Sequence, residues 1–210
     1  MTEKKSSISV RSPSSVVRRP PLILASSSPR RLAFLKDIGI TPDKILHTDI
    51  DETPKPKELP RQLAQRLARE KLDAAAKKEP KGFILAADTV VGVGRRILPK
   101  AETPEEVRNC LRLLSGRRHH VYTGVALRGS DGKILTRVAD STVIFRPLAP
   151  REIDAYVVSN EGIGKAGGYM IQGIAQAYIR FISGSWSNVV GLPLFEVAQM
   201  LRGCGYPVCG

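Results

Sequence analysis

The sequence has few cysteines, few aromatic residues and no long apolar run, and each shortage excludes a class of protein. Only three of its 210 residues are cysteine and 5% are aromatic. Cys110, Cys204 and Cys209 are odd in number and lack metal-ligand spacing, which indicates free thiols in a reducing compartment and argues against a disulfide scaffold. No stretch approaches the roughly 18 apolar residues that cross a bilayer, and the N-terminus lacks the apolar core of a secretory signal. We therefore expect a cytoplasmic protein without a membrane partner.

Positive charge is plentiful, with a formal net charge of +13. Five cationic residues and one acidic residue among the first 21 carry +4 of this excess. The rest of the chain lacks the basic and aromatic interleaving that stacks single-stranded bases, so no stable nucleic-acid complex is expected. The charge fits either a phosphate-rich small molecule or a basic surface that keeps the protein in solution.

The chain divides at about residue 20. Residues 1–20 are rich in Ser, Arg, Lys and Pro without apolar periodicity, which predicts a disordered basic N-terminal arm. An organelle transit peptide is the alternative, since such peptides are also rich in Ser and Arg. Residues 21–210 are predicted to form one domain with ordinary globular composition.

Apolar spacing and turn residues predict the elements of this domain. Strands are expected at 22–25, 83–93, 120–128, 134–145 and in parts of 169–183. Helices are expected from Pro29 to just before Gly39, at 57–78, from Pro104 to about Ser115, at 150–158 and from Pro193 to about Arg202. A Gly-rich loop is expected at 161–168. Alternating strands and helices followed by a hairpin predict an α/β fold with a mixed twisted central sheet flanked by helices.

Serines and arginines stand at the predicted junction between the first strand and the first helix. Ser26, Ser27 and Ser28 are followed by Pro29 and then by Arg30–Arg31. The first N–H groups of a helix have no internal partner and favour anions, so this junction suits a phosphate group. A serine-capped helix with two solvated arginines is the alternative.

Asp88 interrupts the apolar run Phe83–Val91, where an ionised carboxylate is costly to bury unless it is paired or used. At the C-terminal end of a sheet strand it would face the crevice where α/β proteins bind ligands. There it could act as a general base or hold a metal. Alternatively, Asp88 caps a turn together with Thr89.

Lys71 continues the apolar stripe of Leu63 and Leu67 on the predicted helix 57–78. Such a lysine either extends to water along its methylene stem or reaches into a cleft as a phosphate ligand. In the loop before this helix, Asp49, Asp51 and Glu52 form either a set of oxygen ligands for a divalent cation or an acidic loop against a basic helix.

The segment Lys165–Gly173 has a lysine beside three glycines, which permits close backbone approach to a ligand and equally fits an ordinary flexible loop. His47, His119 and His120 lack metal-ligand spacing and are assigned no role.

Taken in order, these segments resemble the Maf family of nucleotide pyrophosphatases from about Pro21 to Arg202. The motifs that carry the resemblance are Ala25–Arg31, Asp51–Glu52, Ala68–Lys71, Ala87–Val91, Leu113–Gly116, Lys165–Tyr169, Ile171–Gly173 and Val189–Leu194. The resemblance implies the Maf or ITPase-like fold, with two lobes around an active-site cleft. It also implies hydrolysis of dTTP and UTP to the nucleoside monophosphate and pyrophosphate, with a divalent cation (Mg²⁺ or Mn²⁺).

The resemblance also implies the roles of individual residues. Asp88 corresponds to the proton acceptor, and Glu52 with Asp88 to ligands of the cation. The polar residues of the phosphate site correspond to Ser26, Arg31, Glu52, Lys71 and Lys100. The residues that mark the dTTP- and UTP-hydrolysing branch correspond to Arg30, Thr89 and Gln172. At Pro99–Lys100 the chain departs from the family, whose usual order at this place is Lys-Pro.

Two other functions remain open at the sequence level. The hydrolysis of dTTP and UTP is expected to keep modified nucleotides out of nucleic acids, and the first of the other functions is removal of other modified nucleotides on the same scaffold. The other is inhibition of septum formation by binding, a role with which the family has been linked. The sequence leaves open the metal, the preferred pyrimidine and the oligomeric state, for which a homodimer is one alternative.

Overall fold

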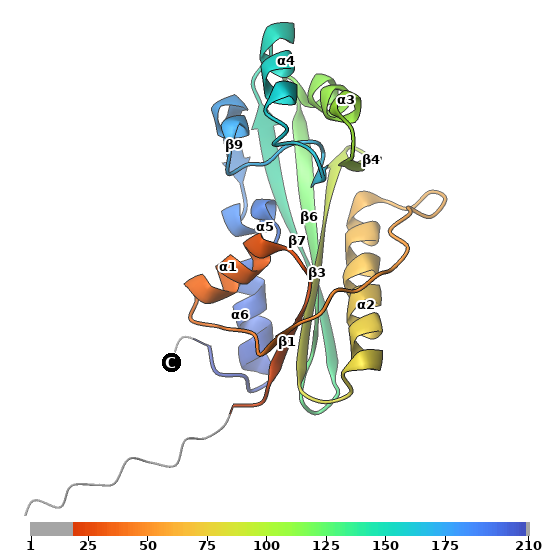
Figure 1. Cartoon of the computed structure of the whole chain (residues 1–210), viewed down its shortest axis with the longest axis vertical. Coiled ribbons are helices and arrows are strands. Elements are labelled where there is room, and N and C mark those ends of the chain that lie inside the picture. The colour runs from red at the N-terminus through yellow and green to blue at the C-terminus, as the bar shows by residue number, and fades with distance from the viewer. Residues whose placement is uncertain (1–18, 209–210) are drawn as a thin grey trace, which may run out of the picture.

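The structure, a computed structural model, describes residues 19–208 (Figure 1). Nearly all of the predicted N-terminal arm lies outside the described residues. Arg19, close to its end, forms an ion pair with Asp43 at 2.9 Å and donates to the carbonyl of Thr41 at 3.0 Å. Within the described range, no helix combines the length and the apolar character needed to span a membrane.

A mixed sheet runs the length of the molecule, as predicted. Within residues 19–208 it has seven strands in the order β2-β1-β3-β6-β7-β9, with β4 paired to β3. Strand β1 is parallel to β2 and β3, and the other pairs are antiparallel. Its strands are β1 (Leu22–Ala25), β2 (Lys44–Ile45), β3 (Phe83–Val93), β4 (Arg96–Leu98), β6 (Arg118–Arg128), β7 (Ile134–Phe145) and β9 (Ile179–Ser183).

Helices cover both faces of this sheet and its far end (Figure 1). One face is covered by α2, the opposite face by α1 and α6, and the end of the sheet by α3 and α4. The helices are α1 (Pro29–Asp37), α2 (Pro60–Lys78), α3 (Pro104–Leu114), α4 (Pro150–Val158), α5 (Trp186–Val190), α6 (Leu194–Gly203) and the 3₁₀ helix η1 (Ile174–Tyr178). The α/β class with a mixed, helix-flanked sheet is therefore confirmed.

Local sequence explains where these helices begin. Helix α3 has the predicted capping box, in which the Thr103 hydroxyl accepts from the Glu106 amide and the Glu106 carboxylate accepts from the Thr103 amide. Helix α2 begins at Pro60, three residues later than the predicted 57, because Pro60 takes the first helical position and Leu59 is extended. Its buried stripe contains Leu63, Leu67 and Lys71, as the spacing indicated.

The packing separates two lobes. One core cluster includes Leu111, Phe145 and Tyr156. It lies around α3, α4 and the adjoining ends of β3, β6 and β7. At the other end of the sheet, separate clusters pack α1 and α6 on one face and α2 on the other. Helix α2 lies so close to β6 that a Cβ at Gly124 would meet the Ala64 carbonyl at 2.1 Å.

Short elements between the lobes differ from the prediction. The segment 169–183 was expected to hold strands, but only β9 is one, and η1 precedes it. The predicted loop 161–168 contains β8 (Lys165–Ala166), which pairs with β5 (Lys100–Ala101) in a separate two-stranded sheet. Elements of two residues have no measurable periodicity, so nothing local in the sequence could reveal this pairing.

Candidate active site

A cleft of about 350 Å³ opens between the two lobes. This volume is within the range of small-molecule sites. Every site residue predicted from the sequence lines it, although these residues come from six separate segments of the chain. They are Ser26, Arg30, Arg31, Glu52, Lys71, Asp88, Thr89, Lys100 and Gln172.

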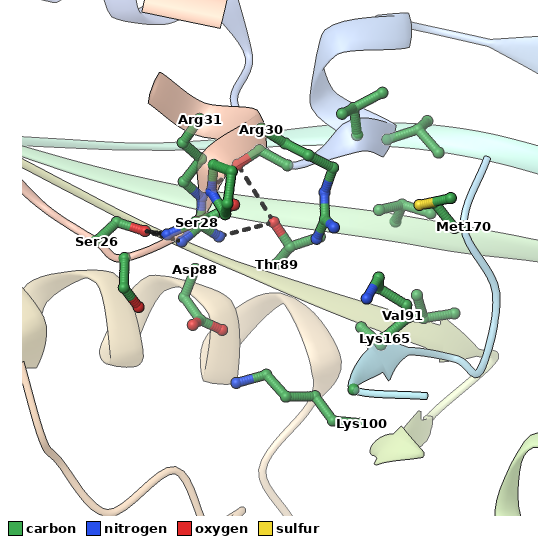
Figure 2. Close-up of a pocket in the computed structure, with 18 of the residues that line it drawn as sticks. Ser26, Ser28, Arg30, Arg31, Asp88, Thr89, Val91, Lys100, Lys165 and Met170 are labelled. Atoms are coloured by element: carbon green, nitrogen blue, oxygen red, sulfur yellow. Dashed lines mark hydrogen bonds between the residues drawn. The ribbon is translucent and has the colours of Figure 1, made fainter. Parts of the chain in front are cut away.

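The junction between β1 and α1 forms one wall of the cleft. The buried hydroxyl of Ser26 accepts a hydrogen bond from Arg31 Nη1 at 3.0 Å (Figure 2). Arg31 Nε donates to the Gly191 carbonyl at 2.8 Å, and Nη2 donates to Thr89 Oγ1 at 3.3 Å. Burial lowers the pKa of the Arg31 guanidinium, and the nearby Asp88 carboxylate opposes that shift. The guanidinium is thus fixed at the start of a helix, where anions are favoured.

Asp88 lies in the middle of β3, as the predicted strand 83–93 implies, and it still faces the cleft. The reason is that β1 pairs with β3 only as far as Ala86, so β3 continues past its neighbour. Asp88 therefore enters the cleft two residues beyond the end of β1, while its backbone still pairs with Gly124 on β6. Asp88 is only 3% exposed. A carboxylate this buried requires a charged or hydrogen-bonding partner.

Lys71 is that partner, and it joins two carboxylates. Its Nζ contacts Asp88 Oδ1 and forms an ion pair with Glu52 Oε1 at 2.7 Å. The other Glu52 oxygen is paired with Lys100 Nζ. Burial raises the pKa of Glu52, but hydrogen bonds from Lys100 and then Lys71 outweigh it, so the net pKa is lowered. Charge alternates along Lys100, Glu52, Lys71 and Asp88.

Lys100 reaches this chain of charges because β5 pairs with β8, with Lys100 opposite Ala166 and Ala101 opposite Lys165. The reversed Pro99–Lys100 order of the sequence therefore does not keep the lysine out of the cleft. The same pairing brings in Lys165, which lines the cleft although the sequence-based site did not include it. Its signals in the sequence were its position beside the glycines of the 165–173 segment and its place in the family motif Lys165–Tyr169, neither of which assigned it a role.

Toward Lys165 and Met170 the lining of the cleft is less tightly bonded (Figure 2), beyond Thr89, which still accepts from Arg31. Arg30 is half-buried, burial lowers its pKa, and among residues 19–208 it makes no hydrogen bond or ion pair. Thr89 Oγ1 is 2.9 Å from Thr123 Oγ1. Gln172 is exposed. Apolar side chains line this end as well, among them Val91, Val121, Met170 and Ile171.

The two carboxylates of the cleft, Glu52 and Asp88, could hold a divalent cation only if substrate oxygens supplied further ligands. Across the described residues, no group of three or more His, Cys, Asp or Glu could hold a metal ion. Glu52 and Asp88 nevertheless both contact one ammonium group, so their oxygens converge on a single point. Mg²⁺ commonly uses one or two carboxylates together with substrate phosphates, and this pair meets that requirement. Asp49 and Asp51 are exposed, and neither lines the cleft.

Fold and cleft together define the class: an α/β protein whose inter-lobe cleft carries the buried carboxylate of Asp88, the partly exposed carboxylate of Glu52 and several cations. A match to a family model narrows this class to one family. Residues 21–204 match the family described as Maf-like protein. The chain belongs to the Maf family, as the sequence motifs indicated.

The chain is also similar to individual proteins. A dTTP/UTP pyrophosphatase of Gluconobacter oxydans is 56% identical over 190 residues, which cover 88% of this chain and 87% of that protein. A dTTP/UTP pyrophosphatase of Caulobacter vibrioides is 54% identical over 187 residues, which cover 89% and 97%. A solved structure of a HAM1 protein from Coxiella burnetii covers 65% of this chain and 90% of its own, with 18% identity and a TM-score of 0.43.

Proposed function

We propose that this protein hydrolyses dTTP and UTP between the α and β phosphates, releasing pyrophosphate and the nucleoside monophosphate. The observation that carries the proposal is the buried Asp88 beside Lys71, in a cleft that also holds Ser26, Arg31 and Lys100. The names of relatives that are more than half identical over nearly the whole chain support the same substrates.

In the proposed mechanism, Asp88 orients a water molecule and accepts its proton as the water attacks the α phosphorus. Its carboxylate is 3% exposed and cannot be fully hydrated, which suits a general base. Arg31, bonded to Ser26 and to the Gly191 carbonyl, donates to phosphate oxygens from a fixed position. Donors held in place in this way stabilise charge that develops in the transition state without having to reorganise.

Lys71 and Lys100 neutralise further charge on the triphosphate. Both already contact Glu52, and Lys71 also contacts Asp88, so they lie beside the acids that would hold a divalent cation. We propose Glu52 and Asp88 as the ligands of Mg²⁺ or Mn²⁺. When bound, such a cation would withdraw charge from phosphate oxygens as a Lewis acid.

Base choice is proposed for Arg30, Thr89 and Gln172. A pyrimidine 2,4-dione presents two carbonyl acceptors on either side of an N–H donor. The Gln172 amide can pair with one carbonyl and the N–H together, and Arg30 can donate to a carbonyl. A site built around such hydrogen bonds discriminates against other bases, because its own polar groups are then left without partners.

We further propose that residues 21–210 act as one domain on cytoplasmic nucleotides, with no stable nucleic-acid complex and with a homodimer as the oligomeric form to be tested. The two cysteines in the described part, Cys110 and Cys204, are free, as expected in a reducing compartment.

The position of cleavage tests the proposal. Purified protein with Mg²⁺ or Mn²⁺ is incubated with UTP, dTTP, CTP, GTP and ATP, and both pyrophosphate and orthophosphate are measured. UTP and dTTP should give pyrophosphate and the monophosphate. Release of orthophosphate with accumulation of the diphosphate would overturn it.

A further inference from the structure

Among the described residues, two cations of the cleft, Arg30 and Lys165, have neither a carboxylate partner nor a set of hydrogen bonds like the one that holds Arg31. Among the described residues, Arg30 makes no hydrogen bond or ion pair, and Lys165 Nζ makes only one hydrogen bond, to the Ile163 carbonyl at 3.1 Å. Both are partly buried and both line the cleft. They differ in this from Lys71 and Lys100, which are bonded to Glu52.

Arg30 and Lys165 reach the cleft from opposite lobes. Arg30 comes from the start of α1, and Lys165 comes from β8, on the short sheet that β8 forms with β5 (Figure 2). The two positive charges also interact. Burial lowers the pKa of Lys165, the charge of Arg30 lowers it further, and the charge of Glu102 opposes both effects. Two partly buried cations without a carboxylate partner favour the binding of an electron-rich ligand group between them.

The surroundings of Lys165 indicate what that group is. Figure 2 shows Val91 and Met170 beside it, whereas Asp88 and Ser26 lie farther along the cleft. The apolar lining at this end also includes Val121 and Ile171. Apolar walls suit the faces of a flat ring rather than a phosphate group, so the electron-rich group is expected to be a ring substituent of the base.

An ammonium group donates hydrogen bonds and cannot accept them. Uracil and thymine carry a carbonyl at ring position 4, which accepts, whereas cytosine carries an amino group there, which donates. The Gln172 amide cannot make this distinction alone, because it presents either a donor or an acceptor when it is flipped. A residue that only donates makes the distinction without ambiguity.

We propose that Lys165 is a specificity-determining residue that donates to the 4-carbonyl of the base and thereby excludes cytosine. This inference rests on the proposed hydrolysis of UTP and dTTP, and it adds the rejection of CTP and the residue responsible. In a complex with CTP, the amino group would face the ammonium group and both donors would be left without an acceptor, which is costly in a partly desolvated site.

Three substitutions at one position test the proposal. Lys165→Gln supplies an amide carbonyl that can accept from the cytosine amino group, Lys165→Arg remains a donor only, and Lys165→Met has neither ability. The measured quantity is the ratio of kcat/KM for CTP to that for UTP, with pyrophosphate as the readout. Lys81→Gln, an exposed lysine outside the cleft, is the matched control for loss of one positive charge.

The ratio should rise about tenfold or more in Lys165→Gln and stay low in Lys165→Arg and in the control. In Lys165→Met it should change only because kcat/KM for UTP falls. An equal fall for CTP, UTP and GTP in all three variants would overturn the proposal and assign Lys165 to the phosphates. An unchanged ratio in Lys165→Gln would overturn it as well. If the unmodified protein hydrolyses no pyrimidine triphosphate, the proposed function itself has failed, which is a different result.

A measurement on the unmodified protein keeps the test valid if the Gln variant does not fold. The triphosphate of pyrimidin-2-one riboside resembles CTP but lacks the 4-amino group. It should be hydrolysed with a higher kcat/KM than CTP, because no donor faces Lys165. Equal values for the two nucleotides would show that position 4 is not read and would overturn the proposal.

Discussion

We propose that one end of the cleft holds the triphosphate (the phosphate end, with Arg31, Lys71 and Asp88) and the other holds the base (the base end, with Arg30 and Gln172). The two ends differ in how their polar groups are satisfied. At the phosphate end, Arg31 bonds to Ser26 and to the Gly191 carbonyl, and Lys71 joins Asp88 to Glu52. At the base end, Arg30 has no hydrogen-bonding or ionic partner among the described residues, and Gln172 is exposed. The first end is a network that exists before the ligand arrives, whereas the second keeps its donors available.

This difference matches the demands of the two tasks. Stabilising a transition state requires groups that are already in position, because reorganisation during the reaction costs energy. Reading a base requires groups whose hydrogen bonds are completed only by the correct ligand. Changes at the phosphate end should therefore affect rate and folding stability, and changes at the base end should affect selectivity.

Asp88→Asn should have the largest effect on rate. It keeps the shape of the side chain and removes the proposed base, so kcat for UTP should fall by ~10²–10⁴. The ratio of kcat/KM between UTP and GTP should stay close to its original value, because Arg30 and Gln172 are untouched. A thermal melt serves as the folding control. Retention of more than about a tenth of the original kcat would assign Asp88 a structural role.

A pair of lysine substitutions at the phosphate end compares burial directly, because both lysines contact Glu52. Lys71→Met leaves the buried Asp88 without its ammonium partner and should lower the free energy of unfolding by about 3–5 kcal/mol. Lys100→Met removes an exposed ion pair and should cost less than about 1 kcal/mol. Urea denaturation of both variants is the measurement, and equal losses would refute a special role for the buried contact.

Acid should weaken the lobe that supports the base end. His119 is fully buried with Nε2 2.8 Å from Tyr169 Oη, and burial, then the charge of His120, lowers its pKa to about 4. Between about pH 6.5 and pH 4, His119 is therefore protonated in the unfolded chain but neutral in the folded protein. This contribution to stability is complete above pH 6.5 and is lost as the pH falls through that window, by about 3 kcal/mol in all.

His119→Gln separates this effect from other acid titrations. Glutamine can still bond to Tyr169, but it does not titrate. Denaturation curves of both proteins between pH 4 and pH 7 should diverge, with the steeper loss in the unmodified protein. Parallel curves would show that His119 does not contribute.

Gln172→Ala should have the smallest effect, and it should appear in selectivity. Because Gln172 is exposed and has no hydrogen-bonding partner among the described residues, its removal should leave the melting temperature unchanged. Loss of hydrogen bonds to an uncharged base edge should cost ~0.5–1.5 kcal/mol each in kcat/KM for UTP. GTP, which gains nothing from this amide, should change little. An equal fall for both nucleotides would make Gln172 a support for its loop.

The same contrast explains what the sequence could predict. Helix α2 and its stripe of Leu63, Leu67 and Lys71 follow from helical spacing, and the interruption of an apolar strand singled out Asp88. These signals are local, because each lies within one element. Arg30 at the strand–helix junction and Glu52 in the acidic loop each carried a weaker local signal with an ordinary alternative, and the family motifs decided between the two. Gln172 was indicated by the family motifs alone.

The remaining features depend on contacts between distant segments. The pairing of β5 with β8 joins residues more than sixty positions apart, and each strand has only two residues. No periodicity predicts such a pair, yet it brings both Lys100 and Lys165 into the cleft. Likewise, Lys71 can contact both Glu52 and Asp88 only because the loop that carries Glu52 lies beside α2. Tertiary packing decides the position of this loop.

The central claim is that Asp88 and the phosphate end direct water to the α phosphorus of a pyrimidine triphosphate. Hydrolysis of UTP in ¹⁸O-labelled water, followed by mass spectrometry of both products, tests it most directly. The account predicts one labelled oxygen in UMP and none in pyrophosphate. Label in pyrophosphate, or UDP with labelled orthophosphate, would contradict it.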